Sequence, residues 1–268
     1  MLKKTPSYRD VLAEALSEFQ KYGYDSDERL DYWLGMLREA IERDMPTDFE
    51  VSRRVRTALE TITQRFKGGG WRKSHPGLRD AAIDRVGHQL SGLLERRILA
   101  SADLIKINRK KAVDQTVQRF VGLATSIPPG GTRVMDKREA KARIGKSIQQ
   151  MTFEERRVVI DQGHKLLANI NQTVAEGDGA IALIWRSNWR VPGYDYRQDH
   201  KERDGHCYLM RGNWATAKGL VKPGPDGYYD TITAVGEEPF CQCHAEFVYD
   251  LGDLPRDMLT KKGLAAIA

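Results

Sequence analysis

The sequence predicts an α+β fold, in which a mostly helical N-terminal region precedes a small C-terminal α+β module with short antiparallel strands. Apolar residues recur every three or four positions up to Gly177-Asp178-Gly179, as in amphipathic helices. Beyond those glycines the apolar runs are short, contain aromatic residues and are separated by turn residues, which is typical of strands. We therefore expect a helical region over residues 1–178, a module over 179–252 and a C-terminal tail over 253–268.

The helical region is predicted to contain several helices with apolar stripes. Thr47 with Glu50 has the pattern of a capping box, in which each side chain bonds a free amide at a helix start. Asp136 with Glu139, and Thr152 with Glu155, indicate two further helix starts. The helices are expected over residues 7–21, 27–43, 47–67, 78–126 (with a break near 101 or 108), from 136 onward, and 153–175.

The C-terminal module is predicted to contain four short strands. Trp185 ends the first and is expected in the core, whereas Trp189 and Trp214, beside arginines, suit either a core or a binding platform. The strands are expected over residues 180–185, 207–210, 228–233 and 245–249.

The composition is that of a soluble globular protein. The chain has 268 residues, of which 40% are hydrophobic and 30% are charged. It contains no run of 18 apolar residues, and no long apolar stretch follows Lys3 and Lys4, so we expect neither a membrane span nor a signal peptide. Three clustered cysteines are too few for a secreted disulfide framework, which favours a reducing compartment.

The positive charge of the chain is concentrated in its middle. Residues 51–150 carry 22 Lys and Arg against 8 Asp and Glu, a net charge of +14, whereas the whole chain has a net charge of +6. Such a segment predicts non-specific binding to nucleic acid or to an acidic protein surface; the alternative is a set of solvated helix faces. The residues expected to contact DNA are Arg96, Arg97, Arg109, Lys110 and Lys111.

The histidines and cysteines near the C-terminus form a candidate metal site. In an extended chain the side chains of Cys241 and Cys243 project to the same face, so both thiolates can reach one ion. Zinc held by these two cysteines, with His200 or His206 completing the shell, is the metal hypothesis. The alternatives are cysteines packed as small hydrophobes, or a disulfide from Cys243 to Cys241 or Cys207 on oxidation. His75, His88 and His164 are expected to be incidental.

A nucleophilic site is also conceivable, because His206 and Cys207 follow Asp204. Adjacent residues of a strand face opposite ways, however, so this proximity is weak support for a catalytic pair. The sequence also lacks the H-E-x-x-H, G-x-S-x-G and G-x-x-x-x-G-K-[ST] motifs. We therefore expect no catalytic residues, and keep a metal-dependent hydrolase or nuclease acting on DNA as the alternative function.

The C-terminal module resembles the phage head morphogenesis domain of minor capsid proteins of the Mu F type. That family pattern is a tryptophan strand, a stretch ending in H-x-x-x-D-G, a variable loop, and C-x-C before a final strand. Asp195, Arg197 and the Gly236-Glu237 pair with Pro239 fit the pattern as well, whereas Gln242 stands where the family commonly has arginine. The matching motif residues are Trp185, His200, Asp204, Gly205, Cys241 and Cys243.

The resemblance implies a virion structural protein, a minor head protein that acts in head morphogenesis, DNA packaging or DNA delivery. Its implied partners are the phage portal or other head and neck proteins and, non-specifically, the genome DNA, with no membrane involved. We expect multiple copies in the virion, and a location in the host cytoplasm during assembly. A third hypothesis is a host-side DNA-binding protein without any capsid contact.

Overall fold

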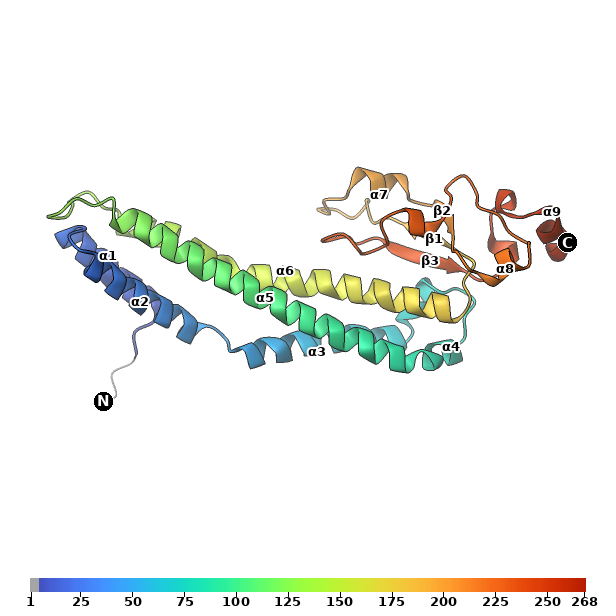
Figure 1. The fold of residues 1–268 in the computed structure, drawn as a ribbon, viewed down its shortest axis with the longest axis horizontal. Coiled ribbons are helices and arrows are strands. Elements are labelled where there is room, and N and C mark those ends of the chain that lie inside the picture. The colour runs from blue at the N-terminus through green and yellow to red at the C-terminus, as the bar shows by residue number, and fades with distance from the viewer. Residues whose placement is uncertain (1–4) are drawn as a thin grey trace. The chain divides into compact units, whose positions relative to one another are not determined.

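The computed structural model describes residues 5–268 and confirms the α+β class (Figure 1). The N-terminal region is helical, and a small antiparallel sheet lies in the C-terminal part. The elements are α1 (Tyr8–Tyr22), α2 (Asp27–Asp44), α3 (Asp48–Lys67), α4 (Asp80–Arg85), α5 (Gly87–Ala124), α6 (Lys137–Gly177), β1 (Ala182–Arg186), α7 (Gln198–Glu202), β2 (Cys207–Leu209), α8 (Trp214–Ala217), β3 (His244–Val248) and α9 (Lys261–Ile267).

The chain divides into two compact units, each built from two segments. The first comprises the chain up to Arg54 together with Ala100–Val158, and the second comprises Val55–Leu99 together with Val159–Ala268. Helices α3, α5 and α6 each contribute residues to both units. These boundaries do not coincide with those expected from the sequence, because residues 55–99 and 159–178 belong with the C-terminal residues. That residues 179–252 fold by themselves stays a prediction.

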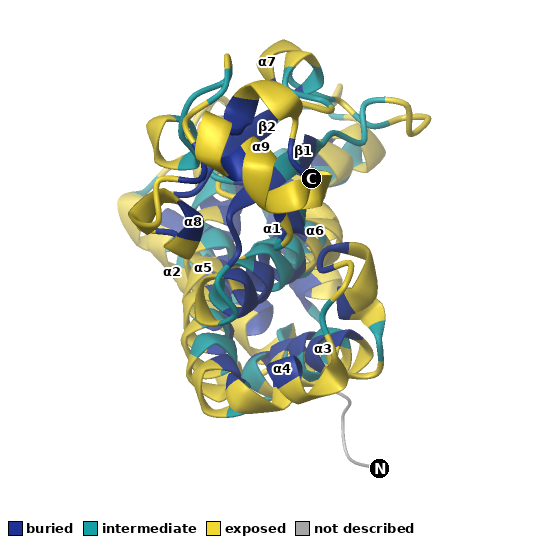
Figure 2. Cartoon of the chain, turned by 90° about the vertical axis from the view of Figure 1, so that its right-hand side faces the viewer, coloured by how far each residue is buried: buried dark blue, intermediate teal, exposed yellow. Residues whose placement is uncertain are grey.

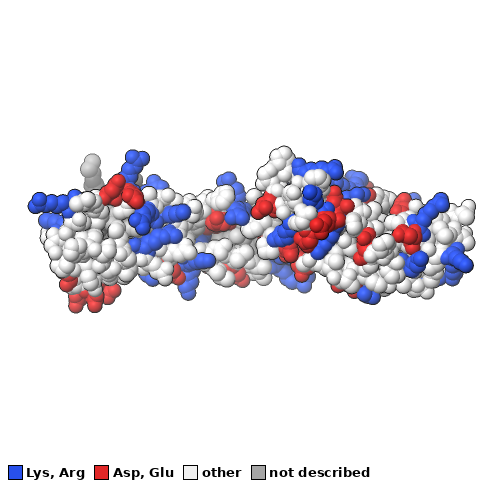
Figure 3. Space-filling model, turned by 90° about the horizontal axis from the view of Figure 1, so that it is seen from above, with Lys and Arg blue, Asp and Glu red and all other residues white. Residues whose placement is uncertain are grey.

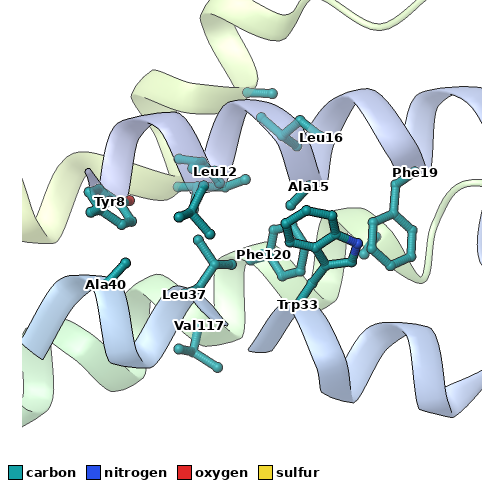
Figure 4. Packing of buried hydrophobic residues seen from close by; sticks show 14 of the residues in the cluster. Tyr8, Leu12, Ala15, Leu16, Phe19, Trp33, Leu37, Ala40, Val117 and Phe120 are labelled. Carbon is teal, nitrogen blue, oxygen red and sulfur yellow. The ribbon is translucent and has the colours of Figure 1, made fainter. Parts of the chain in front are cut away.

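The core of the first unit lies where the apolar stripes of α1, α2 and α5 meet (Figure 4). Phe19 of α1 packs edge-to-face against Phe120 of α5, with ring centroids 5.6 Å apart. Trp33 and Leu37 of α2 are 4% and 1% exposed in the same cluster. Burial of these large side chains, each contributing roughly 1.5–3 kcal/mol, fixes the three helices against one another.

Two of the predicted helix starts are confirmed, and one is wrong. The Thr47 amide donates to Glu50 at 2.8 Å and the Glu50 amide donates to the Thr47 hydroxyl at 3.3 Å, which is the expected capping box. Asp136 accepts from the first amides of α6. No helix starts at Thr152, because α6 runs unbroken from Lys137 to Gly177. Likewise the break in residues 78–126 falls between α4 and α5, not near residue 101 or 108.

The sheet has the strand order β2-β1-β3, and both neighbours run antiparallel to β1. Because side chains alternate along a strand, each strand contributes to two apolar clusters, one on each face. Leu183 and Trp185 of β1 lie in one cluster with Phe247 of β3. Ala182 of β1 and Cys207 of β2 lie in the other. Figure 2 shows the buried residues of these strands in dark blue. A sheet buried on both faces holds its flanking loops in fixed positions.

One of the strands predicted for the C-terminal part is wrong. Residues 228–233 form no strand; Tyr229–Thr231 is a 3₁₀ turn, and the Tyr229 hydroxyl accepts the Val235 amide at 2.8 Å. In the segment expected as a C-terminal tail, Leu254, Met258 and Leu259 are buried in the cluster on one face of the sheet. None of the helices within residues 5–268 is long and apolar enough to cross a bilayer.

His75 is a structural residue of the second unit, contrary to its expected incidental role. Its ring is fully buried and stacks on Phe247 with centroids 5.1 Å apart and planes inclined by 5°. One ring nitrogen lies 2.7 Å from the Tyr249 hydroxyl and the other 2.9 Å from Oδ1 of Asn171. Burial lowers the pKa of His75 to about 4, so the ring is neutral near neutral pH.

Candidate metal centre

Three side chains with metal-binding chemistry converge beside the sheet. Nδ1 of His200 lies 3.6 Å from Sγ of Cys241 and 3.6 Å from Sγ of Cys243, and all three donor atoms lie within 4.8 Å of one another. His200 comes from α7, whereas both cysteines lie in the loop just before β3. The three residues are buried, with His200 0% exposed and Cys241 1% exposed. This His/Cys/Cys group could hold a metal ion.

The distances in the group fit tetrahedral zinc. Zinc bonds a thiolate sulfur at about 2.3 Å and an imidazole nitrogen at about 2.0–2.1 Å, so at a tetrahedral angle these two donors lie about 3.6 Å apart. Both separations between His200 Nδ1 and sulfur have that value. The prediction that the two cysteines face the same way is therefore confirmed.

The charge state of the cysteine pair also suits a cation. The pKa of Cys241 is lowered to about 5, first because the Cys243 thiol hydrogen-bonds to its sulfur, and further because the backbone amides of Cys243 and Gly236 do so. The pKa of Cys243 is raised, because its proton is shared with Cys241 and its thiol is buried. The pair therefore carries one negative charge readily, and a bound cation would stabilise the negative charge of the second thiolate.

The loop that carries the cysteines is fixed on α6. Gly236 has φ of +75°, and a Cβ there would lie 2.8 Å from Cβ of Ala168, so both the conformation and the close approach need glycine. Phe240 also has positive φ (60°), which is uncommon outside glycine, and its amide donates to the Asp161 carboxylate of α6 at 2.5 Å. The loop backbone thus takes its position from the helix.

The motif residues Asp204 and Gly205 shape the opposite side of the site. The Asp204 carboxylate accepts from the Ser187 amide at 2.9 Å and from the Trp189 indole at 3.1 Å, holding the chain that leaves β1. Gly205, with φ of +87°, donates its amide to the Trp185 carbonyl at 2.8 Å. The buried Trp185 ring then packs against the His200 ring, with centroids 5.2 Å apart and planes at 67°.

The structure does not place His206 with these ligands. Its ring is exposed, and its Nδ1 lies 2.8 Å from the Asp226 carboxylate. Cys207 lies in the apolar cluster on the other face of the sheet from Cys241 and Cys243. The expected alternatives of a Cys207–Cys243 disulfide and of a His206–Cys207 nucleophilic pair are therefore wrong. Burial raises the pKa of Cys207 to about 12, which keeps it a neutral thiol.

His244, the other histidine near the motif, is half-buried outside the ligand group. Together with Cys243 it lines a cavity of about 230 Å³ whose other walls come largely from α6 and the segment around Ser74. The pKa of His244 is lowered to about 4, first by burial and then by the charges of Lys73 and Arg186.

The basic cluster expected to contact DNA is only partly exposed. Arg109 is 6% exposed, pairs with Glu155 and donates to the Pro46 carbonyl at 2.7 Å. Arg97 donates to the side chains of Gln162 and Asn169, and burial lowers its pKa. The burial of Arg109 contradicts the prediction that it contacts DNA, whereas Arg97 is half-buried and its contact with DNA stays a prediction. The exposed members are Arg96, Lys110 and Lys111.

Two further acidic residues belong to the site, and the sequence analysis missed both. Asp161 lies in α6, and no motif distinguishes it from other helical carboxylates. Glu238 lies close to His200, with 3.2 Å between Oε2 and Nε2, and it precedes Cys241 by three residues. Its position between Glu237 and Pro239, which both fit the family pattern, is the one sequence signal that could have identified it.

Comparison of the chain with models of protein families, with curated proteins and with solved structures finds no match.

Proposed function

We propose that the protein is a phage virion structural protein: a minor head protein that contacts the portal or other head and neck proteins in head morphogenesis, DNA packaging or DNA delivery. One observation supports this proposal above all. Most of the residues that carry the family resemblance, although spread over residues 185–243, contact one another. Trp185 packs on His200, Gly205 bonds the Trp185 backbone, and Cys241 and Cys243 both face His200.

The burial of the ligands supports a structural role over the metal-dependent hydrolase alternative. His200 and Cys241 are almost completely buried, which leaves little protein surface there for a substrate to contact. We propose that zinc, held by His200, Cys241 and Cys243, joins α7 to the segment before β3. The fourth position of the tetrahedral shell is left to a ligand from outside this group. Bound zinc would stabilise the fold by about 2.7 kcal/mol at a free concentration 100 times its Kd.

The metal proposal is tested by elemental analysis and melting of the full chain. Cys241→Ser and Cys243→Ser remove a ligand each, and Cys207→Ala is the matched control because it removes the third buried cysteine from the other face. We expect one zinc per chain in the parent and in Cys207→Ala, and loss of zinc and of thermal stability in the two serine variants. A parent protein without zinc, whose melting is unaffected by a chelator, would contradict the proposal.

We propose that DNA contact, if the chain delivers or packages the genome, uses the exposed cations of the first unit. Lys110 and Lys111 of α5, and Arg138, Arg143 and Lys146 of α6, are exposed, and none forms an ion pair within residues 5–268. Figure 3 shows Lys and Arg interspersed with Asp and Glu on one face of the molecule. A phosphate contact needs exposed cations but no recognition of bases.

DNA binding is tested by measuring affinity at several salt concentrations. Counterion release predicts that log K falls linearly with log salt, with a slope of about −0.9 for each phosphate contacted. Replacement of these five residues by glutamine lowers affinity and flattens the slope, whereas the exposed pair Lys222 and Lys261 of the second unit serves as the control. Equal slopes in the parent and in the five-fold variant would contradict this assignment.

The virion role is tested in the phage or prophage genome that encodes the chain. Deletion of the gene should leave particles that lack DNA or fail to deliver it, and the protein should be found in purified DNA-filled heads by mass spectrometry. A density for the chain next to the portal in a cryo-electron microscopy map supports the partner assignment. Fully infectious particles without the protein would overturn the proposed function.

A further inference from the structure

The ring of His200 has two nitrogens with different surroundings. Nδ1 faces both cysteine sulfurs at 3.6 Å, whereas Nε2 points to the opposite side, toward carboxylates. A neutral imidazole carries one proton, so Nδ1 can bond a metal only when that proton is on Nε2. Some group must therefore accept a hydrogen bond from Nε2, because the ring is 0% exposed and has no access to bulk water.

Glu238 is placed to accept that hydrogen bond. Its Oε2 lies 3.2 Å from Nε2, and both atoms are buried. Neither atom makes another hydrogen bond of normal angle with the residues that the structure describes. Two buried polar atoms that face each other at this distance, one on an imidazole and one on a carboxylate, form a hydrogen bond after a small rotation of the ring.

Arg197 fixes the Glu238 carboxylate in this position. Its Nε lies 2.6 Å from Glu238 Oε2, and its Nη2 donates to the Pro239 carbonyl at 3.0 Å. The guanidinium thus holds both the side chain of Glu238 and the backbone next to it. Asp199, the other carboxylate near Nε2, is farther away at 3.9 Å, has a 51% exposed side chain and is bound to Arg203. Glu238, and not Asp199, is therefore the carboxylate placed to accept from Nε2 of His200.

We infer that Glu238, held by Arg197, is the positioning residue that makes His200 an Nδ1 ligand of the metal. The inference rests on the proposed metal centre and adds the residues that set its affinity. Carboxylates that accept from the second nitrogen of a ligating histidine fix its tautomer and orientation and raise its basicity, and their loss typically weakens metal binding 10–100-fold. Glu238 and Arg197 do not contact the metal; they act through His200.

Zinc affinity of the reduced full-length protein, measured by competition with a chromophoric chelator, tests the inference. Glu238→Met removes the acceptor, and we expect it to bind zinc 10–100-fold more weakly. Glu238→Gln keeps an acceptor without the charge, and we expect an intermediate loss. Asp199→Asn is the matched control, with affinity close to that of the parent. Long-range ¹H–¹⁵N spectra of the zinc-free protein should show His200 protonated on Nε2 in the parent and in Asp199→Asn, with that preference lost in Glu238→Met.

The outcomes separate this inference from the metal centre itself. A parent that binds no zinc overturns both. A parent that binds one zinc, with equal affinity in Glu238→Met, overturns the role of Glu238 and leaves the centre intact. Equal weakening in Asp199→Asn and Glu238→Met would mean that general negative charge, not positioning, matters. If Glu238→Met does not fold, the comparison of Glu238→Gln with Asp199→Asn decides.

Discussion

Replacement of His75 should change how the stability of the protein depends on pH. The ring is buried between Phe247, Asn171 and Tyr249, and its pKa falls from 6.5 to about 4 in the folded chain. Between pH 6.5 and about pH 4, His75 is therefore protonated in the unfolded chain but neutral in the folded chain. Stability contributed by the neutral ring is complete above pH 6.5 and is lost as pH falls from 6.5 toward 4.

The size of this effect follows from the two pKa values. At pH 5, protonation of His75 stabilises the unfolded state about 30-fold and hardly stabilises the folded state. The difference lowers the free energy of unfolding by about 2 kcal/mol. The assay is urea unfolding at pH 8 and at pH 5. His75→Gln lowers stability at both values, but the parent should lose about 2 kcal/mol more than the variant between them.

The control for this prediction is His88→Gln, because His88 is an exposed histidine of the same unit. It should leave the pH dependence of the parent unchanged. Every other titratable group is shared by the two proteins being compared, so its contribution cancels. A parent and a His75→Gln variant with the same loss of stability between pH 8 and pH 5 would refute the reasoning.

Three further substitutions, one of them paired with a control substitution, test the packing and the hydrogen bonds. Phe120→Ala removes the ring that packs on Phe19 and should lower the free energy of unfolding by about 3–5 kcal/mol, measured by urea unfolding; a loss below 1 kcal/mol would show that this core is not closely packed. Gly236→Ala should lower the melting temperature and weaken zinc binding, since the new Cβ meets Ala168, whereas Gly92→Ala, in open space on α5, should raise stability by about 0.5–1 kcal/mol. Asp204→Ala leaves the Ser187 amide and Trp189 indole without their acceptor and should cost about 1–3 kcal/mol, with exposure of Trp189 detected by its fluorescence; unchanged fluorescence and stability would contradict it.

Most of the long helices, three of the four strands and the common direction of Cys241 and Cys243 could be predicted from the sequence, because each depends on local spacing. Apolar periodicity identifies an amphipathic helix without knowledge of its partner, and the two cysteines face one way because they are two residues apart. The capping box at Thr47 is likewise a matter of three residues.

What could not be predicted depends on contacts between distant residues. Arg109 looks like any surface cation until Glu155, 46 residues later, is seen to bury it. Glu155 itself suggested a helix start beside Thr152, but its carboxylate is used by Arg109 and α6 continues past it. His206 is no farther in sequence from the cysteines than His200 is. Only the fold shows that the His206 ring contacts the Asp226 carboxylate instead.

The contact of Asp161 with the Phe240 amide has a consequence for the behaviour of α6. A helix carboxylate that holds a strained loop residue couples the winding of that helical turn to the geometry of the cysteines that follow. Thermodynamic linkage is reciprocal. If metal binding orders the loop, it must also protect the turn of α6 around Asp161 against local unfolding. The free energy of this protection equals the free energy by which an intact turn favours metal binding. Amide hydrogen exchange near residue 161 would then report on occupancy of a site to which that helix contributes no ligand.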